Sequence, residues 1–386
     1  MPVSVWPALL EQLSDLPDPR VQRTRLHHLI DILSIAICAV ICGAEGWDDF
    51  VAFGRAKQDW LQEKLGLELP AGIPSADTFR RVFARLDPQA LQTCFRLWTQ
   101  QLHVRTQGEV IALDGKVLRH SFDSAAKQSA IHMVSAWAAH ARLVLGQVKI
   151  KEKTNEIPMV PALLSLLDIR GCIVTTDAMS CQKATAAQII SQGGDYVLAV
   201  KENQKNLYDD IVGRFAQAQS RRYEEIAHAS CRHNDKGHGR IETRECDLIT
   251  LSPHDPLWSD VQAEWSGLRS LVRITSTRQI GRECTREERF FISSLPHHAG
   301  RVLGAVRQHW GIENRLHYVL DVSMDEDGCR IRKDHGAENM AVLRHIGLNL
   351  LQQEKTSQRG IKAKRKQAGW DNEYLARILI ADQGQD

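Results

Sequence analysis

The chain has 386 residues, of which 43% are hydrophobic and 25% charged, and this length allows two or three domains with cores of their own. A formal net charge of only +2 means that any nucleic-acid surface must come from local patches. Nine cysteines, an odd number without a CxxC pair, argue against a disulfide framework and against a structural zinc site.

The beginning of the chain lacks the pattern of a signal peptide, in which a basic segment precedes a long apolar one. The most apolar stretch, residues 29–42, contains Asp31 and is too short to span a bilayer. We therefore expect a cytoplasmic protein without a membrane partner.

Residues 1–105 are predicted to form an all-α N-terminal domain. An apolar helix over 28–42 is followed by an amphipathic segment over 47–65, and Ser75 is a candidate N-cap for the next helix. One side of that helix is apolar and has helical spacing, with Phe79, Val82, Phe83 and Leu86. The other side is basic, with Arg80, Arg81 and Arg85. Such a helix could enter a DNA major groove, although a solvated arginine face is the commoner explanation.

Two apolar runs in the middle of the chain each end in an aspartate. Residues 110–113 precede Asp114 and Gly115, and residues 172–176 precede Asp177. Apolar runs of this kind predict buried strands, and we expect Gly115 to end the first one. Two strands that each deliver an aspartate could hold a divalent metal through oxygen ligands, whereas a turn-capping aspartate is the simpler explanation for either strand alone.

Strand and helix patterns alternate around these two runs. They predict an α/β fold in which helices cover a mixed sheet. The further elements are a hairpin over 131–138 and 142–153, helices over 157–167, 182–192 and 206–217, and a short strand over 196–200.

The alternation of strands and helices is interrupted over residues 218–294, where the sequence predicts a β-rich insertion. Strands over 241–251, 268–277 and 286–293 are expected to form a small separate sheet, with a glycine-flanked basic loop over 236–240. This insertion lies within an α/β domain predicted over 106–335.

The chain from Arg301 onward is predicted to be helical, with helices over 302–319 and 339–353. Residues 336–386 are expected to form a helical C-terminal segment with a basic tail. We expect the basic run 362–366 in that tail to be mobile and solvated, with contact to phosphate as the alternative.

The helix around residues 307–317 carries an unusual set of polar side chains. His309, Glu313 and His317 fall at i, i+4 and i+8 and so share a face, while Trp310 and Leu316 are expected to pack on the neighbouring side. A zinc protease is disfavoured because the chain contains no HExxH motif. No phosphate-loop motif is present either, so we expect no nucleotide cofactor.

An acidic cluster follows this helix. It lacks the spacing of a calcium loop and predicts a solvated turn, with Asp321 as an outlying candidate ligand. Its members are Asp321, Asp325, Glu326 and Asp327.

Six motifs, taken together, resemble those of DDE-type transposases of bacterial insertion sequences, and more specifically the H-repeat-associated proteins. The motifs are Ala112–Lys116, Lys153–Ile157, Thr176–Met179, His238–Arg244, His309–His317 and Leu320–Val322. The resemblance extends over nearly the whole chain, including its helical N-terminal region. It implies a ribonuclease-H-like core that carries the β-rich insertion.

The resemblance also implies an activity, namely metal-dependent DNA cleavage at the element's ends and strand transfer into target DNA. Asp114 would bridge two Mg²⁺ ions, Asp177 would bind one and Glu313 the other, with Mn²⁺ as a substitute. The expected partners are double-stranded DNA, both element ends and target, and a second copy of the chain, because two ends must be joined.

Several residues are candidates for contact with DNA. Other DDE transposases carry a Tyr, an Arg and a Lys around the catalytic Glu, but Val306, His309 and Leu320 stand at those positions here. Arg307 and Arg315 are therefore the candidates to replace them. The full set is Lys116, Arg119, His238, Arg240, Arg307, His309, Arg315 and His317.

Two other functions fit the same residues. A nuclease with a ribonuclease-H-like fold would cut DNA without joining it, and an inactive relic of a transposase would still bind DNA. The presence of Asp114, Asp177 and Glu313 argues against decay at the active site itself.

Overall fold

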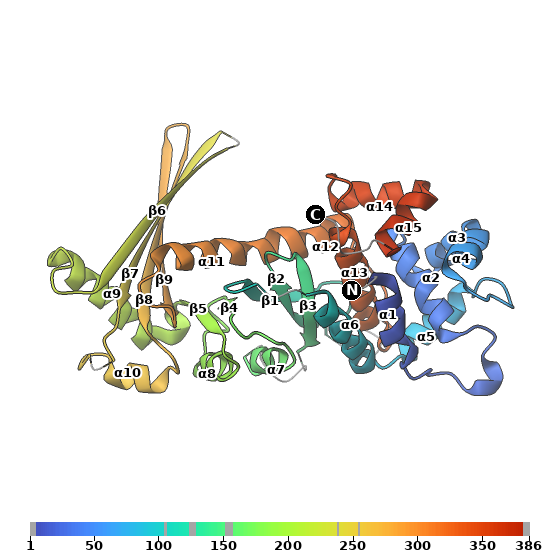
Figure 1. The fold of residues 1–386 in the computed structure, drawn as a ribbon, viewed down its shortest axis with the longest axis horizontal. Helices are drawn as coiled ribbons and strands as arrows, with labels where there is room; N and C mark the ends of the chain where they lie inside the picture. Colours follow the sequence, from blue (N-terminus) through green and yellow to red (C-terminus); the bar gives the residue numbers. More distant parts are fainter. Residues whose placement is uncertain are drawn as a thin grey trace.

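The computed structural model describes residues 5–103, 106–122, 129–150, 157–237, 239–253 and 255–380 (Figure 1). The candidate DNA contact His238 and the motif residues 153–156 lie outside the described residues.

The N-terminal region is helical, as predicted. The hydroxyl of Ser75 accepts a hydrogen bond of 3.2 Å from the amide of Thr78, so Ser75 is the expected N-cap. The predicted segment 47–65 is divided at Lys57 into two helices. The helices are α1 (Val5–Ser14), η1 (Gln22–Thr24), α2 (Leu29–Ile41), α3 (Trp47–Ala56), α4 (Gln58–Leu65), α5 (Ala76–Arg85) and α6 (Pro88–Leu102).

Among the described residues, nine strands form one mixed sheet in the order β3-β2-β1-β4-β5-β9-β8-β7-β6. Strand β4 runs parallel to β1 and to β5, and the other neighbouring pairs are antiparallel. The strands are β1 (Val110–Leu118), β2 (Ile131–Ala138), β3 (Leu143–Lys149), β4 (Ile173–Thr176), β5 (Asp195–Val200), β6 (His228–Gly237), β7 (Arg240–Thr250), β8 (Ser270–Ile280) and β9 (Glu283–Ser293).

Helices cover both faces of the central strands, so the predicted α/β architecture is confirmed. Helix α11 (Ala299–Ile312) crosses one face over β1 and β4, and α7 (Met159–Ser165) and α8 (Lys183–Ser191) lie on the other (Figure 1). The remaining helices of this half are η2 (Glu202–Gln204), α9 (Lys205–Ser220) and α10 (Ser259–Glu264). Because both faces are covered, all of β4 and the first four residues of β1 are buried, without alternation.

Two predictions about the strands are wrong. Strand β1 does not end at Gly115, because β2 continues to pair with it from Asp114↔Ser135 to Leu118↔Ile131. The β-rich insertion does not form a separate sheet either, because β9 pairs with β5 from Val197↔Ser293 to Val200↔Phe290 and joins it to the core.

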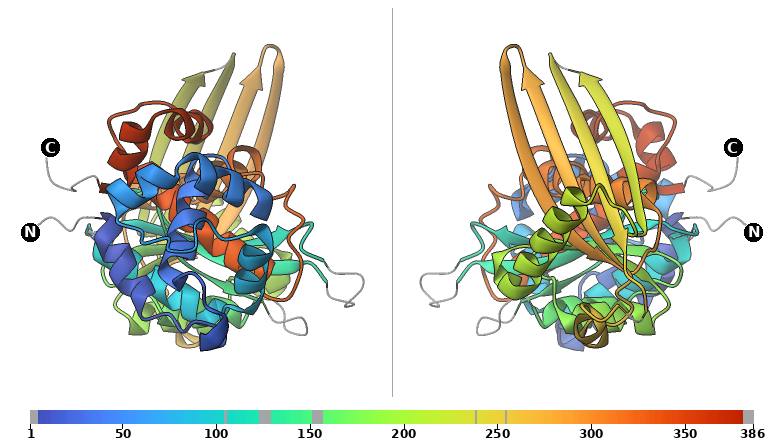
Figure 2. Two further views of the ribbon diagram at one scale, coloured as in Figure 1. Left: turned by 90° about the vertical axis from the view of Figure 1, so that its right-hand side faces the viewer. Right: turned by 90° about the vertical axis from the view of Figure 1, so that its left-hand side faces the viewer.

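Strand β6 was not predicted, because its sequence carries no hydrophobic alternation. Its ten residues are all exposed or half-buried, so no covered face left a pattern in the sequence. Together, β6–β9 form two long hairpins at the end of the sheet opposite β3, and they project beyond the rest of the sheet (Figure 1 and Figure 2).

The C-terminal helices pack against the N-terminal ones. Helix α13 (Gly336–Gln353) contacts α2, α5 and α6, and the side-chain amide of Asn349 bonds both the N–H and the C=O of Val144 in β3, at 2.9 Å each. The other helices here are η3 (Glu313–His317), α12 (Tyr318–Ser323), α14 (Ile361–Trp370) and α15 (Asn372–Ile380). The two ends of the chain thus build one helical body on the β3 edge of the sheet (Figure 1).

The apolar helix α2 lies inside this body, with its side chains from Asp31 to Ile41 buried. In the described part of the chain, no helix is long and apolar enough to cross a membrane.

The basic run 362–366 is not the solvated tail that its charge predicted. It lies in α14, where Lys364 and Arg365 are buried. The Lys364 ammonium donates to the carbonyl of Leu351 at 3.1 Å. The Arg365 guanidinium donates to the carbonyl of Val40 at 3.0 and 3.1 Å. Arg365 therefore adds two donors to a carbonyl in the last turn of α2 that otherwise accepts only from backbone amides at the end of the helix.

We predict that Arg365→Ala lowers the free energy of unfolding by about 2–4 kcal/mol, because it removes a buried side chain whose guanidinium donates two hydrogen bonds to the carbonyl of Val40. The matched control is Lys366→Ala on the exposed side of α14, which should change the free energy of unfolding by less than about 0.5 kcal/mol. Urea unfolding of both variants measures the difference. Equal stabilities would show that the Arg365 contacts do not hold α14 on α2.

Candidate active site

The register of the parallel strands places two aspartates side by side. The pairing of β1 with β4 ends at Leu113↔Thr176, so Asp114 and Asp177 are the next residues on adjacent strands. The four β1 residues before Asp114 are buried, and so is all of β4. Two rigid, buried strands therefore position the pair at the carboxyl edge of the parallel strands, where ligands bind in open α/β sheets.

Glu313 reaches the same place from a different element. Helix α11 contacts β1, β4 and β5, and at its end the chain passes into the π-helix η3, which begins at Glu313. A π-helical turn in a longer helix is often found at functional sites, because it changes the direction of the side chains around it. The regular i, i+4, i+8 spacing assumed from the sequence therefore does not hold between Glu313 and His317.

Asp114, Asp177 and Glu313 all line one cavity of about 790 Å³. Strands β4, β5 and β9 and helix α11 form its other walls, with Thr176, Lys201, Glu202, Asn203, Arg289, His309 and Trp310 among the lining residues. The structure thus brings together the three carboxylates that sequence reasoning selected.

Neighbouring groups of the protein orient both aspartates. Oδ1 of Asp114 accepts a hydrogen bond of 2.9 Å from the amide of Gly115, and Oδ2 lies 3.3 Å from Nδ1 of the buried His317. Oδ1 of Asp177 accepts one of 3.1 Å from the amide of Ser180. The Glu313 side chain, in contrast, is exposed.

The donor set suits a hard divalent cation. Carboxylate oxygens from three elements are the ligands that Mg²⁺ prefers, and it keeps water and phosphate oxygens as its other ligands. Within the described ranges, no three His, Cys, Asp or Glu side chains are already grouped at metal-binding spacing. Three like charges around one cavity repel each other, which keeps such side chains apart in the absence of a cation.

His309 lies behind the carboxylates. Its Nδ1 is 3.0 Å from the hydroxyl of Thr175 in β4. Burial lowers the pKa of His309, while the charges of Asp114, Asp177 and Glu313 act in the opposite direction. All three carboxylates therefore lie close enough to act on this one imidazole.

Lys116 is bound within the protein. Its ammonium makes ion pairs with Asp321 and Glu326 and is only 12% exposed. Burial acts to raise the pKa of Glu326, but Lys116 and then Arg344 outweigh it and hold that pKa below its usual value. The acidic cluster is thus not the solvated turn that was predicted, because Glu326 is buried against Lys116.

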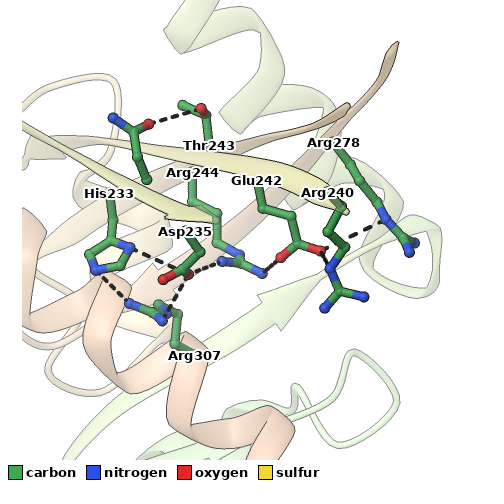
Figure 3. Close-up of polar contacts among 9 residues, drawn as sticks. His233, Asp235, Arg240, Glu242, Thr243, Arg244, Arg278 and Arg307 are labelled. Carbon is green, nitrogen blue, oxygen red and sulfur yellow. Dashed lines mark hydrogen bonds and ion pairs between the residues drawn. The ribbon is translucent and has the colours of Figure 1, made fainter. Parts of the chain in front are cut away.

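Arg119, Arg240 and Arg307 lie outside the cavity. Arg119 is exposed and 3.4 Å from Asp327. Arg307 on α11 binds Asp235 of β6 at 3.0 Å, and Arg240 binds Glu242 at 3.0 Å (Figure 3). The arginines on this side of the hairpins belong to a ladder of ion pairs that fastens α11 to β6 and β7 (Figure 3).

Sequence reasoning missed other lining residues. Trp310 was expected to pack on the side of the helix next to its polar face, but it lines the cavity and is 42% exposed, with the Arg289 guanidinium 4.8 Å from its ring centre. Arg289 lies on β9, whose pairing with the core strands the sequence did not indicate, and no sequence signal linked it to α11. The one signal in the sequence for this part of the cavity was Trp310 itself, which stands close to the candidate carboxylate Glu313.

Comparison with known proteins gives two family matches that together span most of the chain. The sequence model described as "Transposase DDE domain" matches residues 105–350, and that described as "DDE_Tnp_1-associated" matches residues 10–99. The chain is 41% identical to the "H repeat-associated putative transposase YhhI" of Escherichia coli K12, over 96% of this chain and 97% of the relative. It is 40% identical to the "Putative transposase YncI" of E. coli O157:H7, over 97% and 95%.

Among solved structures, a piggyBac transposase in a synaptic complex with hairpin DNA matches at a TM-score of 0.40 and 11% identity, over 99% of this chain and 79% of that chain. So loose a match adds nothing to the argument.

We predict that Lys116→Met lowers the free energy of unfolding by about 3–5 kcal/mol at neutral pH, because Glu326 keeps a buried charge without its cation. The folded-state pKa of Glu326 is depressed, so its stabilising effect exists above its unfolded pKa and is lost as pH falls through the folded value. The two proteins should therefore converge in stability as the solution becomes acidic.

Urea unfolding across this pH range measures the effect, with Arg119→Met as an exposed control of the same charge change. A Lys116→Met protein as stable as this control at neutral pH would contradict the assignment.

Proposed function

This chain belongs to the DDE-domain family of transposases, and we propose that Asp114, Asp177 and Glu313 are the carboxylates with which it cuts DNA at the ends of a mobile element and transfers the cut strands into target DNA. The observation that carries the proposal is the shared cavity. Residues 63 and 136 positions apart along the chain (177 − 114 and 313 − 177) line one pocket through adjacent strand ends and a π-helical turn.

Asp114, Asp177 and Glu313 would together hold two Mg²⁺ ions, or Mn²⁺ in their place. When bound, they would activate the attacking oxygen and stabilise the leaving 3′ oxygen. We assign the orientation of Asp114 to the Gly115 amide and His317, and that of Asp177 to the Ser180 amide.

The reaction proceeds in two displacements at phosphorus. Water first attacks a phosphodiester bond at the end of the element, which leaves a 5′ phosphate on the flanking strand and a 3′ hydroxyl on the element. This hydroxyl then attacks a phosphodiester of the target DNA, forms a new phosphodiester bond and expels the 3′ oxygen of the target strand as a hydroxyl. Both displacements use the same carboxylates and need the same geometry. Aspartates whose positions are fixed by strand ends suit such a two-step reaction.

Double-stranded DNA is the proposed partner, as element end and as target. We further propose that two copies of the chain act together on DNA, because the two ends of one element must be joined to one target. Arg119, an exposed cation outside the cavity whose guanidinium lies 3.4 Å from Asp327, is one candidate for contact with the phosphate backbone.

We predict that Asp177→Asn and Glu313→Gln each reduce strand cleavage by roughly three orders of magnitude or more, while the thermal unfolding midpoint stays close to that of the parent. The matched control is Glu202→Gln, an exposed carboxyl that lines the same cavity and should cut normally. The measurement is strand cleavage, with Mg²⁺, of a plasmid that carries the element and its flanking DNA.

A second arm supplies pre-cut ends with a free 3′ hydroxyl and measures their joining to an unrelated plasmid. Joining by the parent and its loss in both variants is the expected result. Cleavage without joining would reassign the protein as a nuclease, and DNA binding without cleavage would identify an inactive relic. Normal cleavage by either variant would remove that carboxyl from the site.

A further inference from the structure

A second cavity, of about 380 Å³, lies on the other side of the helix that carries Glu313. It is formed by η3, by the turn between β2 and β3 and by the segment that leads into α14. Five cationic side chains line it, namely Arg142, Arg315, Lys355, Arg359 and Lys364. We call these residues and the cavity between them the basic cleft.

Four of these cations have no partner of their own. Among the described residues, no ion pair or side-chain hydrogen bond holds Arg142, Arg315, Lys355 or Arg359, and all four are exposed. The arginines of the β6–β9 hairpins differ, because most of them pair with a neighbouring carboxylate, as Arg240 does with Glu242 and Arg289 with Glu287. The basic cleft therefore concentrates charge that the protein itself does not neutralise.

The one carboxylate in the basic cleft is already engaged. Glu354 is buried, accepts a hydrogen bond of 2.7 Å from the hydroxyl of Tyr374, and lies 3.3 Å from the ammonium of Lys364. Glu354 neutralises the charge of Lys364, and the other four cations leave a net charge of about +4 around the cavity.

The pKa of Lys355 reflects the positive potential in the basic cleft. Burial lowers the pKa of its ammonium, and the charges of Arg142 and Lys364 lower it further. A group placed between like charges in this way gains most from an anion that binds among them.

We propose that the basic cleft binds the sugar–phosphate backbone of the DNA duplex on which the carboxylates act. This inference rests on the proposed function and extends it to a second contact. Arg315 lies two residues after Glu313 in η3, so the two cavities are separated by about the width of one helix, roughly 10–12 Å with side chains. Duplex DNA carries one charge for about every 1.7 Å of its axis, so a duplex with one phosphate at the carboxylates has further phosphates within that distance.

The chemistry of the basic cleft favours backbone contact over base reading. Several separate cations around an open cavity can neutralise successive phosphates, but the cleft offers no recognition helix or strand that could enter a groove. We therefore expect its contribution to be independent of DNA sequence and steeply dependent on salt.

The test measures the affinity of the full chain for a short duplex of arbitrary sequence at several salt concentrations, with a chelator present so that no cleavage occurs. For the double variant Arg315→Gln/Lys355→Gln, the slope of log affinity against log salt should become shallower by about 2, one for each lost phosphate contact. Binding should weaken by about tenfold or more at low salt.

The matched control is Arg55→Gln/Arg221→Gln, which removes two exposed and unpaired cations outside the cleft. A slope for the cleft variant equal to that of this control would overturn the proposal. The conservative variant Arg315→Lys/Lys355→Arg should keep the parent slope, and its failure to do so would also count against phosphate binding.

A second measurement does not depend on substitution. The duplex should protect Lys355 from an amine-acetylating reagent and leave Lys362, which is exposed and does not line the cleft, equally reactive. Protection by polyglutamate but not by the duplex would assign the cleft to an acidic protein partner and overturn the proposal.

These outcomes separate the two proposals. A protein that binds through the basic cleft but never cuts would contradict the proposed function alone. A protein that cuts normally after the loss of Arg315 and Lys355, with unchanged salt dependence, would contradict the cleft alone.

Discussion

The parallel pairing of β1 with β4 is the constraint on which the candidate active site depends. This pairing is buried from Val110↔Ile173 to Leu113↔Thr176, and its end fixes the separation of Asp114 and Asp177. A shift of one residue in either strand would turn one aspartate toward the opposite face of the sheet. Helix α11 covers the same two strands, so the position of Glu313 depends on the same packing.

Strand β1 also joins this site to the rest of the body. Beyond Asp114 it continues against β2, and Lys116 ties it to Asp321 and Glu326 at the far end of the helix that carries Glu313. A strand that ended at the first aspartate would lack this second attachment. The ion pairs thus link two of the three carboxylate-bearing elements directly, which is the support that a preorganised site requires.

The apolar runs before Asp114 and Asp177 marked these two residues as candidate metal ligands, and the resemblance to DDE-type transposases added Glu313. The sequence did not reveal β6, whose residues are exposed or half-buried and show no alternation. The sequence also led to the wrong prediction for Lys364 and Arg365, because a run of five residues rich in charge is typical of a solvated surface. Their acceptors, the carbonyls of Leu351 and Val40, belong to other helices. No local pattern predicts the π-helical turn at Glu313.

The central claim is that Asp114, Asp177 and Glu313 together form one cation site. Titration of the full chain with Mn²⁺, followed by electron paramagnetic resonance of the free ion, measures this without DNA. Each of Asp114→Asn, Asp177→Asn and Glu313→Gln should weaken binding by at least about tenfold, while Glu202→Gln leaves it unchanged. Equal Mn²⁺ binding by the parent and by all three variants would contradict the account.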